Sequence, residues 1–446
     1  MTGRRIWFEH AALSDGVQPD VLVCIDDGAI TSVESGMPPG GDVEQVLGLT
    51  VPGLANAHSH AFHRALRGRT HAGAGDFWTW RDEMYEIAAR LTPEKYLDLA
   101  RATFAEMVLA GYTCVGEFHY VHHRPDGSPY DDPNAMGAAV IAAAREAGIR
   151  LTLLDACYLR GGPGTPLTQA QLRFSDGDVQ TWADRVDLLV DDDDVHIGAA
   201  IHSTRAVDAE SIAMVAHHAG RRAMPLHAHV SEQQAENEQI NAEHGCSPTA
   251  LLAAAGALSS RFTAVHATHL LPTDIDDLAA ANCTCCFCPT TERDLADGIG
   301  PSAALRAAGV RLAIGSDQHA VIDPFEEMRA IEMNERLNSM RRGTHSAVDL
   351  LAAGTVNGYR SLGWDAGGAI AVGQLADLVT VSLDGVRLAG HSGDALVDAL
   401  VFAATAADVT DVIIGGATIV RGGAHATIDV ASELRRSITA VREGER

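Results

Sequence analysis

Uninterrupted apolar runs alternate with alanine-rich stretches through the middle of the chain. One strand-like run lies within residues 51–60, and seven more lie at 112–118, 150–156, 195–203, 224–230, 262–268, 283–289 and 311–317. Helical sequence separates most of them, at 94–110, 135–147, 209–219 and 249–255. Continuous apolar strands are typical of a parallel sheet that is buried on both faces. Eight strand–helix units therefore favour an α/β fold of the (β/α)₈ TIM-barrel type over a doubly wound sheet.

The two ends of the chain have a different, β-rich pattern. Short strand-like runs bounded by turn residues occur at 21–25, 29–33, 376–381, 412–414 and 417–420. We predict a small β-sandwich domain built from both termini, with 1–50 and 366–446 as its two parts and 51–365 as the barrel. The stretch 63–90, after the first barrel strand, is too long for a simple turn, so we expect a functional loop there.

Ionisable side chains stand where the predicted barrel strands end. His58 and His60 lie at the end of the first strand, and alternation along a strand lets both face one ion. By spacing alone, they are equally consistent with core or surface histidines. Further histidines and carboxylates recur within 117–120, 202–205, 227–232, 266–269 and 315–319. Since the chemistry of such barrels lies at this rim, a zinc-like ion with histidine and carboxylate ligands is the simplest explanation.

These positions resemble the amidohydrolase superfamily over nearly the whole chain. The resemblance implies a divalent metal ion, Zn²⁺, bound by His58, His60, His229 and Asp317. It also implies that Glu232, three residues past the ligand on the fifth strand, handles protons as in the deaminase branch. His266 matches a histidine that stands beside the bound water. Many members bridge two metals with a lysine on strand four, but Lys95, before the second strand, is the only lysine here, which favours one metal ion.

Four stretches resemble the formimidoylglutamate deiminase family more narrowly, at 77–81, 118–123, 202–207 and 229–234. The implied substrate, N-formimino-L-glutamate of histidine degradation, is a linear amidine with two carboxylates. Arginine binds a carboxylate through two hydrogen bonds, so arginines are expected at its site. The residues carried over as substrate contacts are His63, Arg81, Tyr120, His202 and Arg205. His63 departs from the family pattern, where glutamine is common, although imidazole can also donate to a carboxylate.

The implied reaction is hydrolytic and gives N-formyl-L-glutamate and ammonia. The metal lowers the pKa of its water towards neutrality, and the resulting hydroxide attacks the formimino carbon. His266, with Asp317, takes the water proton, and Glu232 delivers a proton to the leaving ammonia. The sequence leaves open which of these three catalytic candidates moves each proton.

Two other functions remain open. A related deaminase or chlorohydrolase that acts on a purine, pyrimidine or triazine would use the same metal site with an apolar, aromatic pocket. Such an enzyme would not need Arg81 and Arg205. A non-catalytic barrel that binds a metal or ligand is the other alternative, although Glu232, which is not needed as a ligand, argues against it. The family resemblance also implies a homodimer.

Composition excludes several kinds of partner. A formal net charge of -26 over 446 residues argues against nucleic acid and against anionic membrane surfaces. We find no signal peptide and no apolar run of membrane-spanning length, so we expect a cytoplasmic protein. Four of the eight cysteines lie at 283–288. Zinc cysteines usually come as pairs from separate segments, so core packing is the better interpretation of this cluster.

Overall fold

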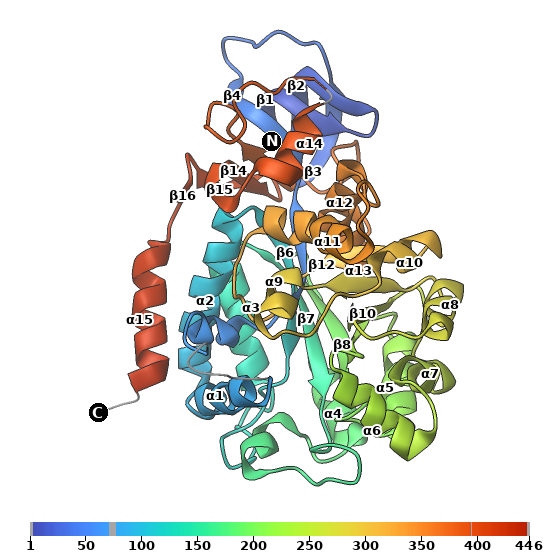
Figure 1. Cartoon of the computed structure of the whole chain (residues 1–446). Coiled ribbons are helices and arrows are strands. Elements are labelled where there is room, and N and C mark those ends of the chain that lie inside the picture. Colours follow the sequence, from blue (N-terminus) through green and yellow to red (C-terminus); the bar gives the residue numbers. More distant parts are fainter. Residues whose placement is uncertain (1–2, 71–76, 394, 444–446) are drawn as a thin grey trace.

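The computed structural model describes residues 3–70, 77–393 and 395–443. Its larger unit is a barrel of eight parallel strands, each hydrogen-bonded to the next along the chain (Figure 1). The strands are β5 (Leu54–Ser59), β6 (Tyr112–His119), β7 (Arg150–Cys157), β8 (Val195–Ser203), β9 (Leu226–Val230), β10 (Phe262–His266), β11 (Thr284–Phe287) and β12 (Arg311–Ile314). The barrel closes beyond β12, where Asp317 N donates to His58 O at 3.0 Å and His60 N donates to Asp317 O at 3.1 Å. The predicted barrel is confirmed.

Helices cover the outside of the barrel. They are α2 (Pro93–Leu109), α3 (Ala135–Ala147), α4 (Val179–Val186), α5 (Ala209–Arg221), α6 (Gln234–His244), α7 (Pro248–Ala254), α8 (Pro272–Ala280), α9 (Pro289–Asp294), α10 (Ser302–Ala307), α11 (Pro324–Ser339), α12 (Ala347–Gly354) and α13 (Val356–Ser361). Local signals set their ends. Thr92 caps α2 by accepting from Lys95 N at 3.3 Å, and Gly148 ends α3 in the left-handed conformation. The four helices read from the sequence correspond to α2, α3, α5 and α7.

Both ends of the chain build a second sheet of eight strands, at the top of Figure 1. Its strands are β1 (Arg4–Leu13), β2 (Gly16–Asp26), β3 (Ala29–Glu34), β4 (Glu44–Pro52), β13 (Leu378–Val381), β14 (Val409–Ile414), β15 (Ala417–Arg421) and β16 (Ala424–His425). β4 and β13 join the two halves as antiparallel neighbours, with Val379 opposite Val51. A β unit assembled from both termini is confirmed, whereas its exact boundaries stay predictions.

Two further helices follow β13: α14 (Ala395–Ala403), and α15 (Val430–Glu443) at the C-terminal end. α15 runs back along the outside of the barrel beside α2 (Figure 1). There Arg101 of α2 donates to Glu433 at 2.8 Å. The last segment of the chain thus packs on the barrel after leaving the second sheet.

The segment 63–90 is largely helical, so the expectation of a long loop is wrong. It contains most of the 3₁₀ helix η1 (Ala61–Leu66) and all of α1 (Phe77–Ala89). Trp80, Met84 and Ile87 form the buried face of α1. Aromatic residues have a low intrinsic helix propensity, and the burial of this face outweighs it. Residues 71–76 and the side chains of 77–79, which include part of one deiminase-like stretch, lie outside the described residues.

The eight cysteines are free thiols. Cys286 and Cys288 face the barrel interior, where they pack with Ala57, Val265 and Ala313. Cys283 and Cys285 belong to the larger core between the strands and the helices. The cluster therefore packs in the core on both sides of β11, as the sequence predicted.

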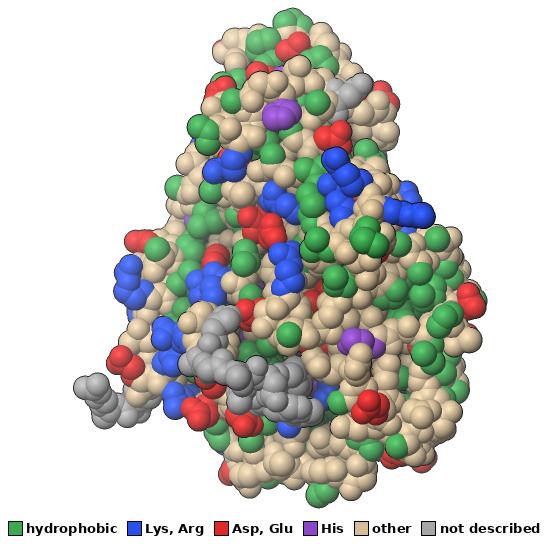
Figure 2. Space-filling view, in the orientation of Figure 1, with side chains coloured by type: hydrophobic (Ala, Val, Ile, Leu, Met, Phe, Trp, Pro, Cys, Tyr) green, Lys and Arg blue, Asp and Glu red, His purple; other side chains and the backbone are tan. Residues whose placement is uncertain are grey.

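No helix in the described parts of the chain is long and apolar enough to span a membrane. On the face in Figure 2, acidic and basic side chains are interspersed over the barrel.

Candidate metal centre and substrate pocket

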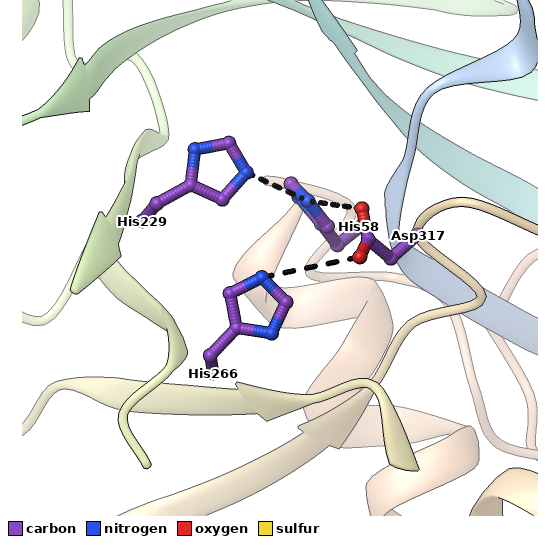
Figure 3. A group of neighbouring side chains, drawn as sticks. All are labelled: His58, His229, His266 and Asp317. Atoms are coloured by element: carbon purple, nitrogen blue, oxygen red, sulfur yellow. Dashed lines mark hydrogen bonds and ion pairs between the residues drawn. The ribbon is translucent and has the colours of Figure 1, made fainter. Parts of the chain in front are cut away.

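Four buried side chains converge at the rim of the barrel, and they are His58, His60, His229 and Asp317. His229 Nε2 lies 3.1 Å from His58 Nε2 and 3.4 Å from His60 Nε2. Asp317 Oδ1 lies 3.3 Å from His58 Nε2 and 3.4 Å from His60 Nε2. Figure 3 shows His58, His229 and Asp317 pointing towards one another, with His266 beside them. The structure therefore brings together all four predicted metal ligands.

Backbone carbonyls fix the protonation of two of these rings. His60 Nδ1 donates to Phe118 O at 2.9 Å, and His229 Nδ1 donates to His202 O at 2.8 Å. Burial lowers the pKa of both imidazoles well below the usual value, so each ring is neutral with its proton on Nδ1. Each Nε2 therefore presents a bare lone pair to the other and to the Asp317 carboxylate. Such an arrangement is repulsive unless a cation lies at its centre.

The donor atoms lie close enough together to share one ion. Zinc–nitrogen bonds of about 2.0–2.1 Å would place neighbouring ligand atoms about 2.9–3.4 Å apart. The four separations given above run from 3.1 to 3.4 Å. Three neutral imidazoles and one carboxylate are also ligands that zinc accepts. The residues present therefore fit a single divalent metal ion.

His266 and Glu232 lie next to the ligand cluster. His266 Nε2 is 4.0 Å from Asp317 Oδ2 (Figure 3) and 3.8 Å from Glu232 Oε1. On the other side of the ring, Nδ1 is 3.6 Å from Glu292 Oε1. Burial alone would lower the pKa of His266, but the surrounding carboxylates raise it well above the usual value. Burial raises the pKa of Glu232. Groups that can carry protons thus flank the candidate ligand Asp317.

Backbone strain concentrates at the same strand ends. Ser231, His266, Ala267, Asp317 and His319 have φ angles between 42° and 66°. This left-handed region is unfavourable for residues other than glycine, and such strain persists where the surrounding structure enforces it, commonly at functional sites. Here it turns the chain sharply at the positions that aim the site residues.

A pocket opens over the cluster. Its lining residues are His60, His63, Trp80, Arg81, Met84, Tyr85, Tyr120, Tyr158, Phe174, His202, Arg205, His229, Glu232, His266, Leu295 and Asp317. All five predicted substrate contacts are among them. Of the predicted ligands and catalytic residues, His58 alone is not in the lining, since it is fully buried below the pocket.

Two arginines give this pocket a cationic side. Arg205 follows β8, and its NH2 lies 3.9 Å from Glu232 Oε2, while its buried Nε makes no hydrogen bond within the described ranges. Arg81 lies on α1, with its guanidinium carbon 5.6 Å from the centre of the Tyr85 ring. A guanidinium group binds a carboxylate through two hydrogen bonds, and two such groups on one wall give the pocket a positive field. The geometry favours an anionic ligand.

His63 and Tyr120 form a hydrogen-bonded pair on the pocket wall, with 2.8 Å between His63 Nε2 and the Tyr120 hydroxyl. Burial lowers the pKa of His63 to about 3, so its ring is neutral. The ring centres of His63 and His60 are 4.6 Å apart. His63 therefore lies beside the metal cluster rather than at the mouth of the pocket.

Sequence comparison identifies the group of proteins that share this arrangement. A sequence model of the amidohydrolase family matches residues 49–419. The chain belongs to the amidohydrolase family. The formimidoylglutamate deiminase of Pseudomonas aeruginosa is similar to it, with 36% identity over 94% of this chain and 95% of the relative.

Solved structures of other proteins are also similar to this amidohydrolase. An amidohydrolase from Brucella melitensis is 31% identical, with a TM-score of 0.91 over 98% of this chain and 99% of that one. An adenosine deaminase from Xanthomonas campestris, solved with bound zinc, is 25% identical, with a TM-score of 0.84 over 99% of this chain and 98% of that one. The fold is thus shared along nearly the full length of these chains.

Several residues of the amidohydrolase pocket were missed in the sequence. Tyr158 and Phe174 add aromatic rings to the wall, and Leu295 adds an apolar one. Tyr158 directly follows β7, so the rule that selected residues at strand ends could have found it. Glu292, which is not in the pocket lining but lies beside His266, was also missed; it lies on the short helix after β11, where proximity to a strand end gave only a weak signal. Phe174 had no such signal, because a long connection carries it back to the pocket.

A second buried group of this amidohydrolase contains His119, His122 and Asp155. The Asp155 carboxylate already accepts two hydrogen bonds of 2.8 Å from Arg185, and a third of 3.1 Å from Trp182. A guanidinium at this distance repels a second cation. The group is therefore better explained as a polar network between the strands and α4 than as another metal site.

Proposed function

We propose that this amidohydrolase hydrolyses N-formimino-L-glutamate to N-formyl-L-glutamate and ammonia, a step of histidine degradation. It uses one divalent metal ion, Zn²⁺, held by His58, His60, His229 and Asp317. The observation that carries the proposal is the presence of Arg81 and Arg205 in one pocket with the metal cluster. Two guanidinium groups match the two carboxylates of this substrate. The 36% identity to a formimidoylglutamate deiminase supports the same assignment.

The bound metal supplies Lewis acidity that makes a water molecule nucleophilic near neutral pH. The residues around it manage protons. His266, with Asp317, would take the proton of the water at Nε2, the nitrogen that faces Asp317 and Glu232. The ring must be neutral to do so, and the charge of a bound Zn²⁺ would offset the carboxylates that raise the pKa of His266. Glu232 carries a proton on its carboxylate to the imino nitrogen of the substrate. Its raised pKa, caused by burial, suits a group that holds a proton until transfer. The oxygen of the water adds to the formimino carbon, and both of its protons are passed to the imino nitrogen. The C–N bond then breaks, the nitrogen leaves as ammonia, and the carbon keeps the oxygen as the carbonyl of N-formyl-L-glutamate.

Other pocket residues hold the substrate in place. Arg81 and Arg205 bind its carboxylates, and the Tyr120 hydroxyl donates to one of them. His202, whose ring centre is 5.1 Å from that of His229, hydrogen-bonds near the reacting group. His63 contributes a neutral imidazole where a glutamine is common in this family. Its buried Nδ1 has no hydrogen-bond partner in the described part of the chain, so it can serve a substrate atom.

We also propose that the enzyme is a cytoplasmic homodimer. Eight free cysteines fit a reducing compartment. The dimer rests on the family resemblance. Sedimentation at several protein concentrations tests it, and a monomer throughout would contradict it.

One alternative has specific support in the pocket. Five aromatic rings line it, those of Trp80, Tyr85, Tyr120, Tyr158 and Phe174. Such a wall suits a deaminase or chlorohydrolase that acts on a flat purine, pyrimidine or triazine. In that case the arginines would contribute little to turnover. A barrel that only binds a metal or ligand is less favoured, because Glu232 and His266 add groups that binding does not need.

Substitution of the arginines separates these functions. Ammonia release from formiminoglutamate is measured for the metal-loaded enzyme and for Arg81→Met and Arg205→Met. Loss of a charged hydrogen-bond donor costs about 1.5–3 kcal/mol, so kcat/KM is expected to fall at least tenfold in each variant. Unchanged turnover in both would refute the carboxylate-binding assignment. Release of ammonia from a purine, but not from formiminoglutamate, would favour the alternative, and metal-replete protein with no activity would favour a binding role.

A further inference from the structure

The hydroxyl of Tyr158 is held in a chain of hydrogen bonds whose direction is fixed. Tyr158 follows β7, and Gln171 lies on the 3₁₀ helix η2 (Gln169–Phe174). Gln171 Oε1 accepts from Thr168 N and from Thr168 Oγ1, both at 2.9 Å. A backbone N–H can only donate, so the amide oxygen must face Thr168. The amide nitrogen is thereby turned towards Tyr158.

Gln171 Nε2 lies 2.7 Å from the Tyr158 hydroxyl oxygen. Because Nε2 can only donate, Tyr158 is the acceptor in this bond. The hydrogen of its hydroxyl must then point elsewhere, and no acceptor for it occurs among the described residues. Tyr158 lines the pocket. Its hydroxyl hydrogen is consequently available to donate a hydrogen bond to a ligand in the pocket.

The position of Tyr158 fits a contact away from the metal. Its ring packs edge-on against His202 with the ring centres 4.5 Å apart, and His202 in turn stands 5.1 Å from His229. Two ring contacts therefore separate Tyr158 from a candidate metal ligand. Phe174 supports the ring from another side at 5.7 Å. Arg205 lines the same pocket, so a carboxylate bound there can reach both groups.

We propose that Tyr158 is a substrate-binding residue that donates a hydrogen bond to a substrate carboxylate remote from the metal, and that Gln171 is the positioning residue that orients it. The identity of that carboxylate, in N-formimino-L-glutamate, rests on the proposed function. Burial raises the pKa of Tyr158, which keeps its hydroxyl a neutral donor. The same pocket would thus prefer a ligand with an acceptor at this point over one that is apolar there.

Titration calorimetry with glutarate, a simple dicarboxylate, tests the proposal on the metal-loaded enzyme. Tyr158→Phe removes only the hydroxyl, and a lost hydrogen bond to a charged group is expected to weaken glutarate binding about tenfold or more. Gln171→Glu keeps an acceptor for Thr168 but also accepts from Tyr158. It therefore withdraws the hydrogen from the pocket, and a similar loss is expected although the ring stays in place.

Tyr112→Phe is the matched control, because the Tyr112 hydroxyl is buried outside the pocket and has no partner in the described residues. Its glutarate affinity should equal that of the wild type. Thermal melting confirms that each variant is folded. Affinity within twofold of the wild type in either Tyr158→Phe or Gln171→Glu would overturn the proposal.

Turnover of formiminoglutamate separates this inference from the proposed function. The wild type could release no ammonia from formiminoglutamate while Tyr158→Phe and Gln171→Glu still weaken glutarate binding. In that case the proposed function fails and the ligand-binding role of Tyr158 stands. If the wild type is active, Tyr158→Phe should raise KM more than it lowers kcat, since the contact is distant from the reacting carbon. A fall in kcat alone would contradict a binding role.

Discussion

Replacement of Glu117 by glutamine should change how the stability of the protein depends on pH. Glu117 lies on β6, behind the turn that carries His58 and His60, and is fully buried. Its carboxyl group accepts from Ser59 Oγ at 2.5 Å, Ala61 N at 2.7 Å and the Tyr96 hydroxyl at 3.3 Å. No arginine or lysine forms an ion pair with it in the described residues. Ser59 and Ala61 flank the candidate ligand His60, so this carboxyl group holds the backbone of the candidate metal site.

Burial raises the pKa of Glu117 from 4.5 to about 8 despite these three donors. The folded protein therefore binds a proton more tightly here than the unfolded chain does. Its contribution to stability is fully present below pH 4.5 and is lost as the pH rises through about 8. A shift of this size corresponds to a cost of about 5 kcal/mol at the alkaline end. Glutamine is neutral at every pH, so the variant avoids that loss.

Urea unfolding of metal-free wild type and Glu117→Gln at several pH values from about 4.5 to 8.5 measures the effect. The difference in unfolding free energy should shift in favour of the variant by a few kcal/mol as the pH rises. Ser59 can reverse its hydroxyl to accept from the new amide, so the site should still bind zinc. Glu238→Gln, at an exposed position, should run parallel to the wild type. If the unfolding free energy of Glu117→Gln also varied with pH in parallel with the wild type, the idea of a protonated buried carboxyl group would be refuted.

Three shorter predictions follow from other contacts. Asp377→Asn should destabilise the fold by about 3–5 kcal/mol in urea unfolding, because it removes the buried carboxylate that pairs with the guanidinium of Arg150 at 2.9 Å and leaves the exposed Asp194 as its carboxylate partner. Gly315→Ala should lower the zinc content after gel filtration, since an added Cβ would lie 2.8 Å from His58 Cβ and 2.9 Å from Cys288 Sγ. Removal of metal by a chelator should abolish ammonia release, and added Zn²⁺ should restore it; activity that survives complete metal removal would exclude the proposed chemistry.

Apolar continuity predicted the barrel strands well, and the strand ends show where such reasoning stops. β8 spans the residues expected for it, whereas β10 and β12 were expected to reach residues 268 and 317 but end at His266 and Ile314. The positive φ angle of His266 explains the end of β10, because a residue in that conformation leaves the strand path. After β12 the chain runs through Gly315 and Ser316 to Asp317, which also has a positive φ angle. The apolar pattern of the sequence predicts which residues are buried, but not where regular strand geometry ends. Here the strands end early, and the irregular backbone that follows orients the side chains of the candidate site.

The candidate site divides in the same way. The predicted metal ligands lie at strand ends, so topology alone brings His58, His229 and Asp317 to one rim. Arg81 was found only through family resemblance, since nothing local showed that its segment is a helix folded over the barrel. Tyr158 stands at a strand end, yet its significance depends on Gln171, thirteen residues away on a 3₁₀ helix. Which group donates and which accepts in a chain of hydrogen bonds depends on the partners that the fold brings together. No pattern of residues along the sequence predicts it.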